Sequence, residues 1–237
     1  MANEPWLSKV FNSRLDKSLS SMAGGARRVS LVLFVSLLIT LTMTTLSSAE
    51  KISFRWAILA DSTEGMRPLD FSGSPIVFSG TALQLYIEHL NNCHVYLYLL
   101  DSSDNLTPIY PPQKGYYDYG FPRGPKLVPP GDQSFTFVPP PGTETLLLIG
   151  SADRLFQLEE LTDTFNRNTN EMGQQMLLLQ KIEDLLAGQE ANSREAERLE
   201  KVTVKYSSAA GIKEKKFEAI RVKSKGFYGR KLLIDHR

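Results

Sequence analysis

The prolines of this chain are concentrated in one stretch, and this distribution limits what that stretch can form. Twelve of the 13 prolines lie between Pro68 and Pro141, and none follows Pro141. Proline fixes φ and lacks a backbone N–H, so it is excluded from helix interiors and from central strands. Residues 68–141 are therefore expected to form short strands joined by many turns.

The best strand patterns lie in and around this proline-rich stretch. Residues 81–90 alternate between apolar and polar side chains, which is typical of a half-buried strand, and residues 93–100 are nearly all apolar, as in a central strand. With residues 106–110, they predict a meander of three antiparallel strands whose first turn is Asn91-Asn92. Further strands are expected at residues 54–60, 134–138 and 143–149.

Short strands separated by proline and glycine turns are typical of antiparallel sandwiches and barrels. We therefore expect a mainly β fold, with an antiparallel β-sandwich, either immunoglobulin-like or an open barrel, over residues 50–151. The one cysteine, Cys93, excludes an intrachain disulfide, so the fold must be held together by core packing. Cys93 lies in an apolar strand pattern and is expected to be a buried thiol.

The pattern becomes helical after residue 151. Residues 153–165 carry apolar side chains at helical intervals, and a second helix is expected to begin at the cap Asn170 and to continue to about Glu200. This helical segment, residues 152–200, has an apolar stripe that predicts either packing on its own domain or contact with a partner. The stripe consists of Met172, Met176, Leu179, Ile182 and Leu186.

The N-terminal region, residues 1–49, has the pattern of an export signal. Two arginines precede an uncharged run, residues 29–49, that has a short apolar core and small residues at its end. This pattern predicts a secretory signal peptide cut after Ala49, with Met22 as the better start. The alternative is a retained transmembrane helix. The bulk of the chain is expected to be periplasmic or secreted in the first case, and to face the periplasm from an inner-membrane anchor in the second.

Charge is distributed unevenly along the chain. Residues 201–237 carry 11 Lys and Arg against 3 Asp and Glu, whereas residues 50–200 carry 11 against 21. Residues 201–237 also alternate, which predicts a basic, β-rich C-terminal segment with a hairpin near Lys225-Gly226. A basic end can dock on the acidic body, on a partner or on an anionic surface, or it can simply be solvated. Nucleic acid is not an expected partner of an exported chain.

No catalytic or metal-binding motif is assembled in the sequence. His89 and His94 flank the predicted turn and could approach each other, but zinc needs about two further ligands that no spacing supplies. Ser103-Asp104-Asn105 matches one element of the serine penicillin-recognising enzymes, whose other elements are missing, so a turn is expected there. The sequence therefore predicts no enzyme activity, no cofactor and no metal. An enzyme is the third alternative, and a structure in which acids, bases or metal ligands converge would support it.

The best candidate for binding is an irregular loop, residues 111–126, in which aromatic residues lie among glycines and prolines. Exposed tyrosine and phenylalanine rings offer flat amphipathic surface at low entropic cost, and functional loops lie on rigid β scaffolds. The alternative is that two or three of these rings are buried and cap the end of the sandwich. The candidate residues are Tyr116, Tyr117, Tyr119 and Phe121.

Residues 79–151 show a particular order of strands and turns. The order comprises the apolar strand pair 83–88 and 95–100, the segment Leu-Thr-Pro-Ile-Tyr-Pro at 106–111, Val-Pro-Pro-Gly at 128–131, and residues 135–151 with their Pro-Pro-Gly-Thr-Glu turn. It resembles a bacterial family, the domain of unknown function 4384. The resemblance implies an exported or membrane-attached module, in some proteins beside caspase-like peptidase or protein kinase domains, and it carries over no catalytic residues.

These observations lead to one expected function and one alternative. We expect an exported, non-enzymatic module of the bacterial envelope that binds or senses an envelope protein or a glycan. The alternative is a structural or assembly protein of the envelope that oligomerises through the helix predicted at residues 171–200. Contact with the membrane is expected through residues 29–49 if they are not cleaved.

Overall fold

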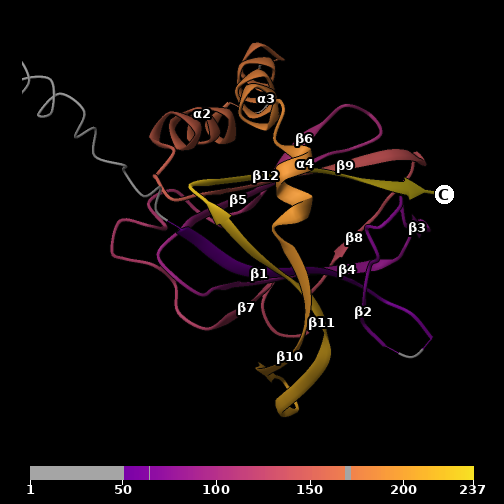
Figure 1. The fold of residues 1–237 in the computed structure, drawn as a ribbon. Helices are drawn as coiled ribbons and strands as arrows, with labels where there is room; N and C mark the ends of the chain where they lie inside the picture. Colours follow the sequence, from indigo (N-terminus) through magenta and orange to yellow (C-terminus); the bar gives the residue numbers. More distant parts are fainter. Residues whose placement is uncertain (1–50, 64, 169–171) are drawn as a thin grey trace, which may run out of the picture. The chain divides into compact units, whose positions relative to one another are not determined.

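The computed structural model describes residues 51–63, 65–168 and 172–237. These residues form one compact unit of two β-sheets and three α-helices (Figure 1). The predicted mainly β fold is therefore confirmed.

Several predictions concern residues that the structure does not describe. They are the export signal or membrane helix at residues 29–49, the start at Met22 and the cap at Asn170. Among the helices that the structure does describe, none is long and apolar enough to cross a membrane.

Seven strands form the first sheet: β1 (Lys51–Ala60), β2 (Arg67–Pro68), β4 (Ala82–His89), β7 (Pro125–Val128), β8 (Phe135–Thr136), β10 (Glu197–Ser208) and β11 (Gly211–Lys225). Its main strand order is β10-β11-β1-β4-β7, and all its neighbouring strands run antiparallel. The short strands β2 and β8 pair with β1 and β4, respectively.

Five strands form the second sheet: β3 (Ile76–Val77), β5 (His94–Leu100), β6 (Leu106–Tyr110), β9 (Gly142–Ser151) and β12 (Phe227–His236). Their order is β3-β12-β9-β5-β6, and only the pair β3 and β12 is parallel among the described strands. The strands predicted between residues 54 and 149 are all present, although β8 is only two residues long.

The predicted three-strand meander is wrong, because β4 lies in the first sheet while β5 and β6 lie in the second. The Asn91-Asn92 turn therefore carries the chain from one sheet to the other. The Asn91 side chain accepts a hydrogen bond from the Ser53 backbone N–H at 2.8 Å, which fixes this crossing to the start of β1. β5 is nearly all apolar, so both of its faces have to be buried. It pairs edge to edge with the apolar strand β9, and side chains on both faces of these two strands are buried.

The two sheets share an apolar core. Alternate residues of β1, including Phe54 and Trp56, lie in this core together with Val95 and Leu97 of β5. The Phe54 ring packs edge-on against Tyr228 of β12, with ring centroids 5.5 Å apart. The first and last long strands of the described chain are thus in direct contact.

The three helices are α2 (Phe156–Arg167), α3 (Met172–Leu186) and α4 (Glu190–Glu195). Figure 1 shows α2 and α3 beside the second sheet, on the side away from the first sheet. Leu158 of α2 and Ile182 of α3 are fully buried there against the outward-facing side chains of β5 and β9. The predicted apolar stripe is divided, because Leu186 is buried as well while Met172 and Met176 are exposed.

The helical segment ends earlier than predicted. Gly188, two residues after the last residue of α3, adopts a left-handed conformation with φ of 72°, which favours termination of that helix, and only the short α4 follows. β10 begins at Glu197, and residues 197–200 pair with β11 instead of continuing a helix. The prediction of helix to about Glu200 is therefore wrong, since the strand ladder with β11 supplies the backbone hydrogen bonds.

The C-terminal residues are part of the sheets. β11 lies between β10 and β1, and β12 lies between β3 and β9. The hairpin predicted near Lys225-Gly226 is wrong, because β11 and β12 lie in different sheets and the turn at Gly226, whose φ of 72° suits glycine, carries the chain from one sheet to the other. The hairpin of this segment joins β10 to β11 instead. The divisions that the sequence suggests at residues 151 and 200 therefore mark changes of secondary structure within one compact unit.

Several basic side chains of this C-terminal part form ion pairs with acidic residues that precede them. Arg221 contacts Glu200 at 2.7 Å, and Arg230, which is buried, contacts Glu197 at 2.5 Å. Further ion pairs join Lys213 to Asp132 and Lys231 to Glu183. The basic C-terminal residues 201–237 thus dock on the acidic residues 50–200, which is one of the roles considered for them.

Candidate functional site

The aromatic loop runs from β6 to β7, and its rings divide into buried and exposed positions. Tyr117 is buried, Tyr116 and Phe121 are half-buried, and Tyr119 is fully exposed. The structure therefore places part of the loop against the protein, as the capping alternative requires, and leaves one ring free in solvent. Gly115, with φ of 72°, begins a tight turn in which the Asp118 N–H donates to the Gly115 carbonyl at 2.9 Å.

Tyr117 fixes the loop to β5. Its hydroxyl accepts a hydrogen bond from the Val95 N–H at 2.9 Å and donates one to the Val95 carbonyl at 2.8 Å. Its ring packs edge-on against His94, with centroids 4.9 Å apart, and His94 contacts Phe121 at the same centroid distance. Burial raises the pKa of Tyr117, so this hydroxyl stays protonated and keeps both hydrogen bonds.

Tyr116 is held by a second hydrogen-bonded chain. Its hydroxyl lies 3.1 Å from the Tyr110 hydroxyl, which in turn lies 3.0 Å from His89 Nε2. His89 Nδ1 donates to the Cys93 carbonyl at 2.9 Å. The half-buried part of the loop is therefore linked to the end of β4 through buried groups.

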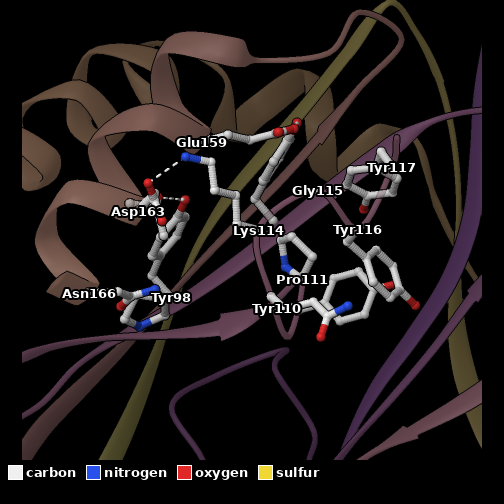
Figure 2. Close-up of a pocket in the computed structure, with 14 residues that line it drawn as sticks. Tyr98, Tyr110, Pro111, Lys114, Gly115, Tyr116, Tyr117, Glu159, Asp163 and Asn166 are labelled. Atoms are coloured by element: carbon white, nitrogen blue, oxygen red, sulfur yellow. Dashed lines mark hydrogen bonds and ion pairs between the residues drawn. The ribbon is translucent and has the colours of Figure 1, made fainter. Parts of the chain in front are cut away.

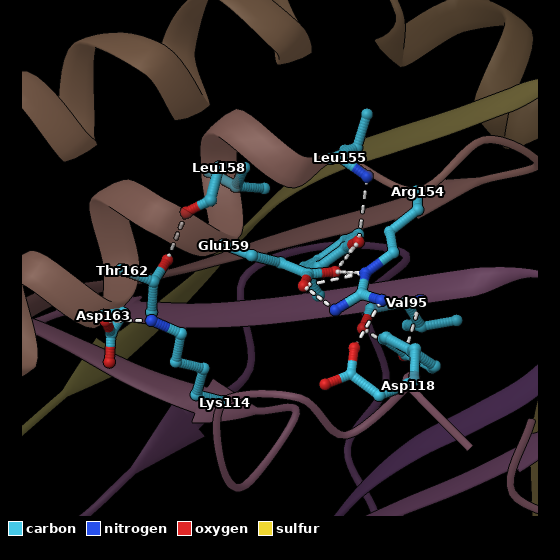
Figure 3. Close-up of polar contacts among 11 residues, drawn as sticks. Val95, Lys114, Asp118, Arg154, Leu155, Leu158, Glu159, Thr162 and Asp163 are labelled. Atoms are coloured by element: carbon cyan, nitrogen blue, oxygen red, sulfur yellow. Dashed lines mark hydrogen bonds and ion pairs between the residues drawn. The ribbon is translucent and has the colours of Figure 1, made fainter. Parts of the chain in front are cut away.

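Arg154 links the loop to helix α2 (Figure 3). Its guanidinium contacts Asp118 of the loop at 2.6 Å and Glu159 of α2 at 2.7 Å. Glu159 also accepts a hydrogen bond from the Tyr96 hydroxyl at 2.8 Å. The hydrogen bonds that Arg154 donates to Glu159, together with the contact with Asp118, raise the pKa of Arg154, so this link stays charged. Asp118 is thereby positioned one residue before the exposed ring of Tyr119.

A small pocket of about 60 Å³ lies between the loop, the strands β5 and β6, and helix α2 (Figure 2). Lys114 crosses it and contacts Asp163 at 2.6 Å, and the hydrogen bond from Lys114 lowers the pKa of that carboxyl. Tyr98 lies at its floor, with its hydroxyl 2.9 Å from Thr162 Oγ1. The lining also includes Tyr110, Tyr116, Gln113 and Asn166.

The chemistry of this pocket is suited to binding. Burial raises the pKa of Tyr96, Tyr98 and Tyr110, so their hydroxyls stay neutral and act as hydrogen-bonding groups. Glu159 and Asp163 are engaged in ion pairs with Arg154 and Lys114. The volume of about 60 Å³ admits only a small group, such as a hydroxyl or a methyl at the edge of a larger ligand.

The other sequence candidates lie in structural positions. His89 and His94 both contact Tyr117, and no group of three potential metal ligands occurs among the described residues. Burial lowers the pKa of both histidines, that of His89 to about 4, and raises the pKa of Cys93 to about 12. Cys93 is buried, as predicted. The segment from Ser103 to Asn105 forms a turn around the Asp101 carboxylate.

Sequence reasoning missed the residues on which the loop rests. Tyr96 and Tyr98 alternate with Val95 and Leu97 along β5, and that spacing places the two tyrosines on one face of the strand. Two tyrosines on one face of an otherwise apolar strand were a signal for a polar group opposite them. Glu159 of α2 provides this group for Tyr96.

Comparison with known proteins supports one family resemblance. The model of the domain of unknown function DUF4384 matches residues 77–154, about a third of the chain. No curated protein and no solved structure matches the chain. The matched part contains β4 to β9 and the aromatic loop. Residues 77–154 of this chain are thus similar to the domain of unknown function DUF4384, as the strand and turn order predicts.

Proposed function

We propose that this chain is an exported module that binds a protein or a glycan of the bacterial cell envelope through the loop of residues 111–124. The observation that carries the proposal is the position of Tyr119, a fully exposed ring on an anchored loop. Export is supported by the signal-like pattern of residues 29–49.

The anchoring of the two residues that precede Tyr119 favours recognition. Tyr117 is hydrogen-bonded to Val95, and Asp118 is paired with Arg154, so the backbone that carries Tyr119 is held before any ligand arrives. A ring on a preorganised loop loses little conformational entropy on binding. The pocket behind the loop, next to Tyr116, offers hydrogen-bonding groups for a second contact.

Tyr119→Ser is expected to weaken binding at least about tenfold, because aromatic anchors at the centre of an interface contribute 2 kcal/mol or more. The purified protein, immobilised, is exposed to a bacterial envelope fraction, and captured proteins and sugars are quantified separately. Protease and glycosidase treatment of the fraction distinguishes a protein from a glycan. Ile212→Ser, which changes an exposed apolar residue near the β10–β11 turn, is the matched control and should bind as the wild type does. Equal capture by the wild type and Tyr119→Ser contradicts the proposal.

The alternative function, assembly of an envelope structure, has one specific observation in its favour. Met172, Met176 and Leu177 of α3 are exposed, Met176 at 64 %, although the rest of the helix packs on the sheet. These side chains form an apolar end of α3 that a second copy of the chain could cover.

Met176→Glu is expected to shift a concentration-dependent oligomer toward monomer, because a carboxylate cannot be buried unpaired in an apolar contact. Light scattering after size-exclusion chromatography, over a wide range of protein concentration, measures the shift. Gln180→Glu adds the same charge to an exposed position of the same helix and serves as control. A wild-type protein that stays monomeric at every concentration excludes the assembly function.

A further inference from the structure

Three polar side chains from distant parts of the chain meet at the end of the core between the sheets. His236 of β12 places its Nδ1 2.8 Å from Glu144 Oε1 and its Nε2 2.9 Å from Ser79 Oγ. His236 and Glu144 are each 2 % exposed, whereas Ser79 is exposed. A surface hydroxyl is therefore linked through a buried imidazole to a buried carboxylate.

The fold holds this row of groups from several sides. β12 and β9 pair along their whole length, which brings Glu144 and His236 together. The Phe137 ring stacks on the His236 imidazole, with centroids 5.1 Å apart and an interplanar angle of 26°. The Ser79 N–H donates to the Arg237 carbonyl at 2.9 Å, which sets the serine beside the end of β12. The second carboxylate oxygen, Glu144 Oε2, has no hydrogen-bond partner among the described residues.

A hydroxyl, an imidazole and a carboxylate in this order are the arrangement that activates serine in hydrolases, and it is recognised by geometry on unrelated folds. We propose that Ser79 is the nucleophile of an acyl-ester hydrolase site and that His236 is its general base. Glu144 is a positioning residue, because it accepts the Nδ1–H and so turns the lone pair of Nε2 toward the hydroxyl. This activity goes beyond the proposed binding function and uses a different part of the molecule.

The reaction proceeds in two balanced steps. Ser79 Oγ bonds to the carbonyl carbon of the ester while His236 Nε2 takes the hydroxyl proton; the bond to the leaving alcohol then breaks, and His236 gives that proton to the alcohol oxygen. Water next attacks the acyl-serine ester with His236 again accepting a proton. The acyl group leaves as a carboxylic acid, and the proton on His236 restores the serine hydroxyl.

The surface around Ser79 indicates the class of substrate. Phe78, its neighbour in sequence, is 62 % exposed, and Val138 is 68 % exposed. Val138 follows Phe137, whose carbonyl accepts the Gly80 N–H at 2.9 Å, so these apolar side chains flank the serine. The immediate sequence neighbours of Ser79 and Phe137 carry no charge, and the side chain of Arg237, whose carbonyl accepts the Ser79 N–H, is engaged in an ion pair with Asp235. An apolar acyl group fits this surface.

The rate of hydrolysis at this site is limited because the backbone N–H groups next to the serine are already hydrogen-bonded. The N–H groups of Ser79 and Gly80 already donate to the carbonyls of Arg237 and Phe137, so neither is free to stabilise the oxyanion. One such donor contributes about 10²–10³ in rate. The site is therefore expected to act on activated acyl esters with good leaving groups, and more slowly than a serine protease.

Labelling of the full chain with a fluorophosphonate probe tests the nucleophile. The expected result is a single adduct that peptide mapping locates at Ser79, with labelling abolished in Ser79→Ala and slowed about 100-fold or more in His236→Gln. Ser103→Ala, which removes an exposed serine of a turn, should label as the wild type does.

The rates of p-nitrophenyl butyrate hydrolysis should rank the wild type and these variants in the same order as the labelling rates. Glu144→Gln should also change the pH profile of hydrolysis, and Glu144→Asp should restore part of the rate, which a merely structural carboxylate would not do.

A second variant keeps the test decisive if His236→Gln does not fold. Ser79→Cys should react with iodoacetamide about tenfold faster than Ser103→Cys at pH 7, because an adjacent imidazole promotes the thiolate. Cys93 is buried in the wild type and should stay unreactive in both variants. The proposal is overturned if the wild type remains unlabelled at probe concentrations that saturate a known serine hydrolase. It is also overturned if the two introduced cysteines react at equal rates.

Discussion

Replacing Tyr117 by serine is expected to lower the free energy of unfolding by about 3–5 kcal/mol, the usual cost of removing a buried aromatic ring. The ring is buried between His94 and Phe121, and its hydroxyl forms hydrogen bonds with both the N–H and the carbonyl of Val95. A serine hydroxyl is too short to replace these bonds, so buried backbone groups of β5 would lose their partner on that side. Urea unfolding followed by circular dichroism measures the change.

Two variants of the same loop separate this structural role from the binding role. Tyr117→Phe keeps the ring and removes only the hydroxyl, so it should cost about 1–3 kcal/mol. Tyr119→Ser changes a fully exposed ring and should stay within about 0.5 kcal/mol of the wild type. If Tyr117→Ser unfolds at the same urea concentration as Tyr119→Ser, Tyr117 does not anchor the loop.

Local patterns were sufficient to predict the strands, but not the two faces of the central strand. Residues 93–100 are nearly all apolar, and only the structure shows that Val95 and Leu97 lie between the sheets while Tyr96 and Tyr98 lie under the helices. The loop could be identified from its composition. Which of its rings is buried could not, because burial of Tyr117 depends on contacts with β5 that are distant in the sequence.

Pairing between distant segments is what the sequence could not show. The turn at Asn91-Asn92 is compatible both with a hairpin and with a crossing between sheets, and only the partners of β4 and β5 distinguish the two. The same holds for Ser79, Glu144 and His236, which are brought together by the register of β12 with β9 and by the pairing of β3 with β12. No spacing rule connects three residues so far apart along the chain.

Acidification from pH 6.5 to pH 4 is expected to lower the free energy of unfolding by about 3 kcal/mol through His89 alone, at about 1.4 kcal/mol for each pH unit. Burial lowers the pKa of His89 in the folded protein from 6.5 to about 4. Between these two values the unfolded chain binds a proton on this residue and the folded protein does not. The stability that His89 contributes is therefore complete above pH 6.5 and is lost as the pH falls toward 4.

His89→Gln isolates this contribution, because glutamine can hydrogen-bond at the same position and does not titrate. Urea unfolding at pH 4, 5, 6 and 7 should show a loss of stability that is smaller in the variant than in the wild type by about 3 kcal/mol over the whole range. His94, whose pKa burial also lowers, is present in both proteins and cancels in the comparison. His89 is hydrogen-bonded to Tyr110, and Tyr110 is hydrogen-bonded to Tyr116 of the loop. Protonation of His89 is therefore expected to disturb the hydrogen bonds that hold the loop of the proposed binding surface. Equal losses in the wild type and the variant would assign the acid sensitivity to other groups.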